Sequence, residues 1–319
     1  MRVLLTGAAG FIGGHMCRAM LDQGFEVLGI DNFDPFYDRS IKEETIRELS
    51  TDSRFSFAEV DIRDDSALSG MLAHVDIIVH LAARAGVRPS IDEPALYASV
   101  NVGGTVSLLE ACRAAGVQRL VFGSSSSVYG DATPVPFRED APAMSPISPY
   151  AATKRSGELI CEVYSHLHGL KIAALRFFTV YGPRQRPDLA IHRFTRLLTS
   201  GSPIQQYGDG STERDYTHVD DIVEGVLGAV RWTEDRGVGY DVFNLGESKT
   251  VRLDYLIQLI ADAVGVVPKV EVAPRQPGDV LRTFADISKA RRVLGYNPRT
   301  SIEDGIVDFV DWYRGRYGN

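Results

Sequence analysis

The sequence predicts an α/β fold, in which a doubly wound parallel sheet is followed by a smaller C-terminal α/β domain. Short β-branched and aliphatic runs alternate with longer amphipathic segments through the first half, which is typical of parallel sheets covered by helices. The runs are apolar almost throughout, as expected for strands buried on both faces. After Arg176 the alternation becomes irregular, because proline and glycine interrupt it in segments such as YGPRQRPD and YGDGST. No linker or repeat separates the two parts, so we expect them to pack together around a cleft.

Six runs are the expected strands of the sheet. In chain order they are RVLLTG (2–7), EVLGID (26–31), FSFAEVD (55–61), VDIIVHLA (75–82), QRLVFGSS (118–125) and KIAALRFF (171–178). Helices are expected between them, and again near 189–200 and 219–233. We assign residues 1–176 to the first domain and residues 177–319 mainly to the second, and we expect residues 219–246 to pack back on the first.

The composition argues against several classes of protein. The net charge is −8 and no block of lysine and arginine stands out, so we do not expect a nucleic acid as partner. The three cysteines lie far apart, without the paired spacing of a metal site or disulfide framework, so we expect a cytoplasmic protein without a metal. No segment approaches the roughly 18 to 20 apolar residues of a membrane span, so a membrane is not expected as partner either.

The segment LLTGAAGFIGG predicts a phosphate-binding loop, because Gly7, Gly10 and Gly13 lie between the first strand and a helix. Glycines there let the backbone approach a pyrophosphate, and the helix N-terminus supplies N–H donors. Asp31 ends the second strand, where its carboxylate can bind the hydroxyls of an adenosine ribose and would repel a 2′-phosphate. The sequence therefore predicts a Rossmann-like domain over residues 1–176 that binds NAD rather than NADP. The alternative is a glycine-rich turn that only packs a helix on a strand.

Other residues at the ends of the expected strands would line the cofactor. Asp61 and Ile62 follow the third strand, where an adenine could lie, and HLAA (80–83) ends the fourth. The further expected contacts are Phe11, Ile12, Asn32, Asp61, Ile62, Leu81, Ala82, Ala83 and Phe177.

The segment SPYAATKRSG indicates a catalytic pair. Tyr150 and Lys154 are four residues apart in an expected helix, so they project from the same face. A cation close to a phenol favours the phenolate and so lowers the pKa of the tyrosine toward the range of a general base. The alternative, taking the spacing alone, is a surface helix. The serine run FGSSSSVYG ends the fifth strand on the edge where ligands bind in such sheets, so a serine there would face the Tyr150 helix.

The glycine loop, Asp31, the serine run and the Tyr-x-x-x-Lys pair, in this order, resemble the extended short-chain dehydrogenase/reductase family over nearly the whole chain. The resemblance implies that Tyr150 removes a proton from a sugar hydroxyl and that Ser125 shares the hydrogen bond. Lys154 would hold the nicotinamide ribose and lower the pKa of Tyr150, so both residues also count as cofactor contacts. Asn101, in SVNVGGT, matches a family position near the cofactor, although capping or packing inside the fourth helix is an equal alternative. The family also implies a homodimer through helices near 95–115 and 148–168.

The serine run also bears on the reaction. Dehydratases of this family carry Asp-Glu before VYG, and decarboxylases carry Glu, whereas this chain has Ser126 and Ser127. Elimination would lack its proton donor, which leaves reversible oxidation at C4. The resemblance therefore implies a nucleotide-sugar 4-epimerase, in which hydride passes to NAD and returns, so that NAD is regenerated in each cycle and stays tightly bound.

Segments in the second part resemble the UDP-glucuronate 4-epimerase branch of the family, above all YGPRQRPDLA. Galactose epimerases usually have asparagine where Thr179 stands, so a uronic acid is favoured and UDP-galacturonate is the expected product. The substrate residues implied, besides Thr179, are Arg88, Ser126, Ser127, Arg186, Arg214 and Arg275.

Arg214 would bind the diphosphate through its planar guanidinium, and Arg275 is a second candidate whose register is uncertain by one residue. Arg186 or Arg88 would face the sugar carboxylate. The alternatives are a surface ion pair of Arg214 with Asp215 or Asp220, and solvated side chains for the other two arginines.

Two other functions stay open from the sequence alone. A UDP-glucose/UDP-galactose 4-epimerase would use the same three catalytic residues on a sugar with a neutral C6. A regulatory NAD-binding protein would keep the fold without turnover, and such proteins commonly lose the tyrosine or the lysine. Both are present in this chain.

Overall fold

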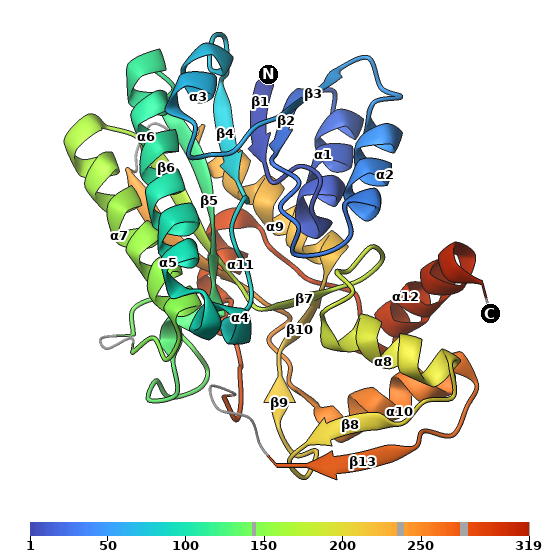
Figure 1. The fold of residues 1–319 in the computed structure, drawn as a ribbon. Coiled ribbons are helices and arrows are strands. Elements are labelled where there is room, and N and C mark those ends of the chain that lie inside the picture. Colours follow the sequence, from blue (N-terminus) through green and yellow to red (C-terminus); the bar gives the residue numbers. More distant parts are fainter. Residues whose placement is uncertain (142–144, 235–238, 275–279, 319) are drawn as a thin grey trace.

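The computed structural model describes residues 1–141, 145–234, 239–274 and 280–318. Among these residues, seven parallel strands form one sheet in the order β11-β6-β5-β4-β1-β2-β3 (Figure 1). The strands are β1 (Arg2–Thr6), β2 (Glu26–Asp31), β3 (Phe55–Glu59), β4 (Ile77–His80), β5 (Arg119–Ser125), β6 (Lys171–Phe177) and β11 (Tyr240–Leu245). The doubly wound fold predicted from the sequence is confirmed, and the six expected runs form β1 to β6. The seventh strand, β11, pairs in parallel with β6.

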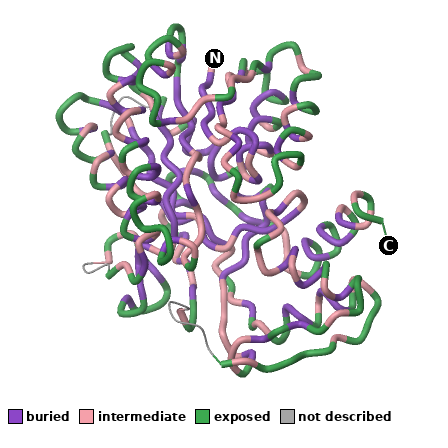
Figure 2. Tube along the Cα trace, in the orientation of Figure 1, coloured by how far each residue is buried: buried purple, intermediate pink, exposed green. Residues whose placement is uncertain are grey.

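Helices cover both faces of this sheet, which explains why its central strands are mainly apolar. One face packs against α1 (Phe11–Asp22), α2 (Arg39–Leu49), α9 (Val219–Trp232) and α11 (Ser288–Leu294). The other packs against α3 (Asp65–Met71), α6 (Gly104–Ala115) and α7 (Pro149–His168). In β1, Val3, Leu4 and Leu5 are fully buried, and the central strands are the buried part of the trace in Figure 2.

The second part of the chain forms a smaller α/β unit beside the carboxyl edge of the sheet (Figure 1). Three short strand pairs build it: β7 (Thr179–Tyr181) with β10 (Tyr216–His218), β8 (Ile204–Tyr207) with β13 (Val270–Ala273), and β9 (Glu213–Arg214) with β12 (Val251–Arg252). Its core lies between α8 (Ala190–Thr199), α10 (Leu253–Val264) and α12 (Ile302–Tyr317).

Short helical segments complete the edge where the two parts meet. They are α4 (Val87–Asp92), α5 (Pro94–Tyr97), the π-helical η1 (Ala98–Gly103) and the 3-10 turn η2 (Ser126–Tyr129). No helix in the described part of the chain is long and apolar enough to cross a membrane. The described residues also contain no group of three or more His, Cys, Asp or Glu side chains that could hold a metal ion.

Candidate active site

A cleft of about 820 Å³ lies between the sheet and the smaller unit. Its walls come from the segments that follow β1, β2, β4, β5 and β6, and from β7, α8 and the β8–β9 region. This is the carboxyl edge of a parallel sheet, where ligands bind in doubly wound folds.

The glycine loop at the floor of the cleft accepts no side chains. Gly7 has φ of +76°, and a Cβ there would lie 2.9 Å from the backbone nitrogen of Ala82. A Cβ on Gly13 would lie 2.0 Å from the carbonyl oxygen of Gly7, so the loop and α1 could not approach one another. The first turn of α1 carries no acidic residue, and its N-cap Gly10 offers no capping side chain. The free N–H groups of this turn therefore fit a pyrophosphate.

Asp31, at the end of β2, is placed to bind a ribose. Its two carboxylate oxygens accept hydrogen bonds from the backbone of Ala9 (3.2 Å) and Phe33 (2.9 Å), yet the side chain still lines the cleft. Burial raises the pKa of this carboxyl, and the ammonium of Lys42 opposes the shift. Each carboxylate oxygen can accept more than one hydrogen bond, so hydroxyl groups of a ligand can still be bound.

The other expected cofactor residues fall into two groups. Phe11, Ile12, Asn32, Asp61, Ile62, Leu81, Ala82, Ala83 and Phe177 line the same cleft. Asn101 does not line it: its side chain accepts from the backbone N–H of Arg84 (2.8 Å) and donates to the Arg84 carbonyl and the Thr153 hydroxyl, both at 3.0 Å. These contacts match the packing alternative, and they fix the segment after β4 to α7.

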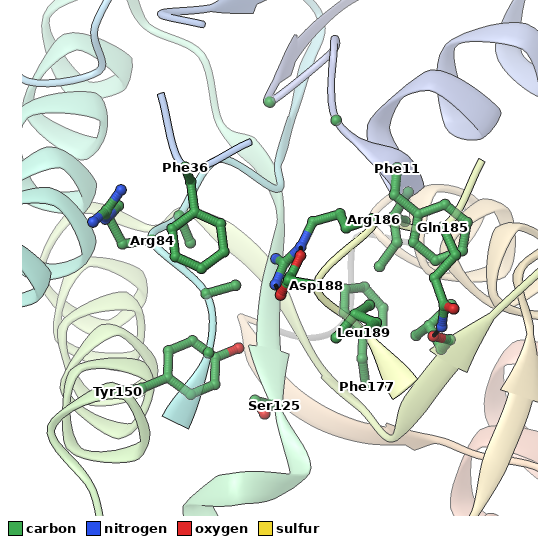
Figure 3. A pocket seen from close by; sticks show the side chains of 18 of the residues that line it. Phe11, Phe36, Arg84, Ser125, Tyr150, Phe177, Gln185, Arg186, Asp188 and Leu189 are labelled. Atoms are coloured by element: carbon green, nitrogen blue, oxygen red, sulfur yellow. Dashed lines mark hydrogen bonds and ion pairs between the residues drawn. The ribbon is translucent and has the colours of Figure 1, made fainter. Parts of the chain in front are cut away.

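The predicted catalytic residues meet at the centre of the cleft. Ser125 is the last residue of β5, and α7 begins just before Tyr150 because the Ser148 hydroxyl caps it by accepting from Ala151 N–H (3.2 Å). The Tyr150 hydroxyl points toward Ser125 (Figure 3). Lys154 lies one turn further along α7, and its ammonium donates to the carbonyl of Gly123 at 2.7 Å. Burial lowers the pKa of Lys154 to about 8.

A second charge, borne by an arginine and not foreseen at this position, lies near Tyr150. Burial raises the pKa of this tyrosine, and the groups among the described residues that oppose the shift are the hydrogen-bonding Ser125 and the guanidinium of Arg186. Arg186 thus adds a cation from the second part of the chain. The ammonium of Lys154 donates to Gly123 on the strand, and its expected effect on Tyr150 stays a prediction.

The predicted substrate residues are only partly brought together. Arg88, Thr179, Arg186 and Arg214 line the cleft. Ser126 and Ser127 begin η2 and do not line it, although the Ser125 hydroxyl donates to the Ser127 hydroxyl at 3.2 Å. Arg275 lies outside the described residues.

The arginines are held within the site. The Arg186 side chain is only 17% exposed, pairs with Asp188 (2.7 Å) and lies 5.2 Å from the centroid of the Phe36 ring, so it is not a solvated surface arginine. Arg88 lies 5.1 Å from the centroid of the Tyr207 ring. Asp215, one of the two partners considered for Arg214, is fully buried and accepts from backbone N–H groups, including that of Glu247 (2.8 Å).

Sequence reasoning missed several residues of the cleft. Phe36, Lys42, Arg84, Asp188 and Arg193 all line it. Arg84 directly follows the HLAA segment, and Phe36 and Lys42 lie in the segment after Asp31, so their position behind strand ends was the available signal.

This combination of fold and site is that of an extended short-chain dehydrogenase/reductase. The chain belongs to this family of nucleotide-sugar epimerases and dehydratases, because the family profile described as GDP-mannose 4,6-dehydratase matches residues 4–309. The resemblance inferred from the motifs is thereby confirmed.

Individual relatives are similar over their whole length. A UDP-glucuronate 4-epimerase of Thermodesulfobacterium geofontis is 40% identical over 97% of this chain and 95% of that protein. The UDP-glucuronic acid 4-epimerase of Bacillus cereus, solved with UDP-glucuronic acid and NAD, is 38% identical with a TM-score of 0.94, over 99% of this chain and 100% of that one. The UDP-glucose 4-epimerase of Thermotoga maritima, solved with UDP-glucose, is 32% identical with a TM-score of 0.90, over 99% of each chain.

Proposed function

We propose that this protein is an NAD-dependent isomerase that interconverts UDP-glucuronate and UDP-galacturonate by inversion at C4, through a transient 4-keto sugar. One observation carries the proposal: Ser125, Tyr150 and Lys154 share their cleft with Arg186 and Thr179. The first three form a proton-transfer site, and the other two offer donors to a sugar acid. The similarity to UDP-glucuronate 4-epimerases of two other organisms supports the same assignment.

The described residues fit NAD. Gly7 and Gly13 leave no room for a side chain, so the loop and the N-terminus of α1 lie close together as a pyrophosphate site requires. Asp31 offers a carboxylate to a ribose and disfavours a 2′-phosphate. When bound, NAD would accept the hydride from C4 of the sugar. The overall reaction consumes no oxidant or reductant, so NAD can remain bound to the protein.

Tyr150 acts as the general base. Its phenol accepts the proton of the C4 hydroxyl, and Ser125 donates a hydrogen bond that stabilises the charge, as it already lowers the pKa of the phenol. The guanidinium of Arg186 acts in the same direction. On the return step the 4-keto sugar would present its opposite ring face to the cofactor, and Tyr150 gives the proton back to the C4 oxygen.

The preference for a uronic acid rests on Arg186 and Thr179. A 4-keto uronic acid is a β-keto acid, so an epimerase must hold its carboxylate away from the geometry in which carbon dioxide is lost. Arg186 offers a planar fork that binds a carboxylate through two hydrogen bonds, and Thr179 adds a hydroxyl. With serine at positions 126 and 127, no acid stands beside Ser125 to drive elimination.

We assign NAD binding to residues 1–176 together with 219–246, and UDP-sugar binding mainly to residues 177–319. The pairing of β11 with β6 and the packing of α9 on the sheet support this division. The three cysteines are free and buried, which fits a reducing cytoplasm.

The chain is also proposed to form a homodimer through α6 and α7. Supporting this, α7 exposes an apolar stripe of Leu159 (47%), Val163 (52%) and Leu167 (65%) at four-residue intervals.

The test is to incubate purified protein with UDP-glucuronate, without added NAD, and to follow the sugar by NMR. We expect UDP-galacturonate to form without a pentose product, and a Tyr150→Phe variant to be slower by about 10²-fold or more. UDP-glucose is assayed alongside. Turnover of UDP-glucose alone would assign the protein to the UDP-glucose 4-epimerases instead, and bound NAD without any turnover would indicate a regulatory protein.

A further inference from the structure

Asp34 and Arg84 lie on opposite sides of the glycine loop. Asp34 follows β2 and Arg84 follows β4, and the sheet order places β1 between these two strands. Both side chains line the cleft. A contact between them must therefore pass over the carboxyl end of β1, where Gly7 and the first turn of α1 face a dinucleotide.

The two side chains form a close ion pair. Nη1 of Arg84 donates to Oδ1 of Asp34 at 2.6 Å, and Nη2 donates to Glu93 at 2.6 Å. Arg84 is only 10% exposed and Asp34 26%, whereas Glu93 is 50% exposed. The pair across the cleft is thus the less exposed of the two, but Asp34 still meets solvent, so salt can act on the pair.

Both ends of the pair are held in place by further hydrogen bonds, and the Arg84 end is linked to the catalytic helix. The backbone of Arg84 is held by Asn101, which also bonds to Thr153, and the Thr153 hydroxyl donates to the carbonyl of Tyr150 at 2.8 Å. On the other side, the Lys42 ammonium donates to the Asp34 carbonyl at 2.7 Å.

Phe36, two residues after Asp34, extends this bridge toward the substrate side. Its ring lies between the guanidinium groups of Arg84 and Arg186, at 5.1 and 5.2 Å from the ring centroid, and above Tyr150 in Figure 3. The segment after β2 therefore contacts the arginine assigned to the sugar acid as well as the segment after β4.

We propose that Asp34 and Arg84 form a latch that closes over the bound dinucleotide and retains it between turnovers. This inference rests on the proposed function, because it takes the ligand beneath the latch to be NAD. The cofactor can leave only after the ion pair separates, so the pair slows dissociation. A higher salt concentration weakens the latch and speeds the loss of cofactor.

The test compares Asp34→Asn with Glu93→Gln. Asparagine keeps the oxygen that accepts the backbone N–H of Phe36, so the turn is preserved while the charge is lost. The control, Glu93→Gln, removes the charge of the other carboxylate that the Arg84 guanidinium contacts. Glu93 follows β4, as Arg84 does, so this contact does not cross the cleft. Each protein is loaded with NAD and diluted, and the protein-bound NAD is measured by chromatography over time at low and high salt.

We expect Asp34→Asn to lose NAD about tenfold faster than wild type, and its rate to depend less on salt, whereas Glu93→Gln changes the rate by less than about twofold. A purely structural role of Asp34 would lower the unfolding temperature without changing the salt dependence, and would overturn the latch. Equal dissociation rates for Asp34→Asn and wild type would overturn it too, while leaving the proposed function intact. Wild-type protein that does not bind NAD would overturn both.

Discussion

At the scale of single residues, Lys154 shows that a functional residue can lower the stability of the folded protein. Its ammonium is buried, with the Gly123 carbonyl as its hydrogen-bond acceptor and the Phe122 ring centroid 5.4 Å away. Burial disfavours the charged form, which is why the pKa falls from 10.5 to about 8. At neutral pH the protein therefore keeps a positive charge in an unfavourable place, which is typical of functional sites.

We predict that Lys154→Met abolishes activity but raises the free energy of unfolding, by about 3 kcal/mol at pH 7. Between pH 8 and 10.5 the unfolded wild-type chain holds a proton that the folded one has lost, so its free energy of unfolding rises with pH. The advantage of the variant should shrink across this window. Urea unfolding at pH 7 and pH 10 measures it, and a variant less stable than wild type at pH 7 would contradict the argument.

The sequence predicted this pair's position but not its electrostatics. The four-residue spacing placed Tyr150 and Lys154 on one face of a helix, as observed. It could not show that Arg186, from a loop of the smaller unit, also acts on the phenol, since that interaction exists only after the two parts pack together.

At the scale of elements, a buried ion pair joins the pieces that carry the catalytic residues. Glu158 on α7 accepts from Arg176 on β6 at 2.8 and 2.9 Å and from the Ser124 hydroxyl on β5 at 2.6 Å, and it is fully buried. Burial opposes its charge, but the bonds from Arg176 and Ser124 hold the pKa of this carboxyl below its usual value. Glu158 thus fixes α7, with Tyr150 and Lys154, against β6 through Arg176 and against β5, the strand that ends at Ser125, through Ser124.

We predict that Glu158→Gln destabilises the protein by about 3–5 kcal/mol, because the guanidinium of Arg176 is left buried without its counter-charge. Glu162→Gln, one turn further on the exposed face of α7, is the control and should change stability by less than about 0.5 kcal/mol. Chemical unfolding of both variants at pH 7 gives the comparison. Equal stability of the two variants would show that Arg176 finds another partner.

Elements were predictable where their pattern was unambiguous. The first six strands are continuous apolar runs, because helices bury both of their faces. Strand β11, with the sequence YDVFNL, lies at the edge of the sheet and mixes polar with apolar residues, so no strand was assigned to it. The π-helical turn around Asn101 was expected to be ordinary helix, because periodicity cannot report one extra residue in a turn.

At the scale of the whole molecule, the outer face of α7 carries apolar side chains that the single chain leaves exposed. Leu159, Val163 and Leu167 are each about half exposed or more, although the inner face of the same helix is fully packed. Apolar side chains repeating every four residues on a solvent face are typical of a helix that packs against another copy. The proposed homodimer would bury this stripe.

We predict that the protein is a dimer by light scattering after gel filtration, and that Val163→Asp converts it to a monomer, because the interface would bury an unpaired carboxylate. Val307→Asp is the matched control, since Val307 on α12 is also 52% exposed but lies on another face. If both variants stay dimeric, α7 is not the dimer interface. If wild type is monomeric, the proposed homodimer is wrong and the apolar stripe of α7 is not covered by a second copy. Because Tyr150 and Lys154 lie on α7, activity of the monomeric variant would further show whether the dimer supports the catalytic helix or only covers its apolar face.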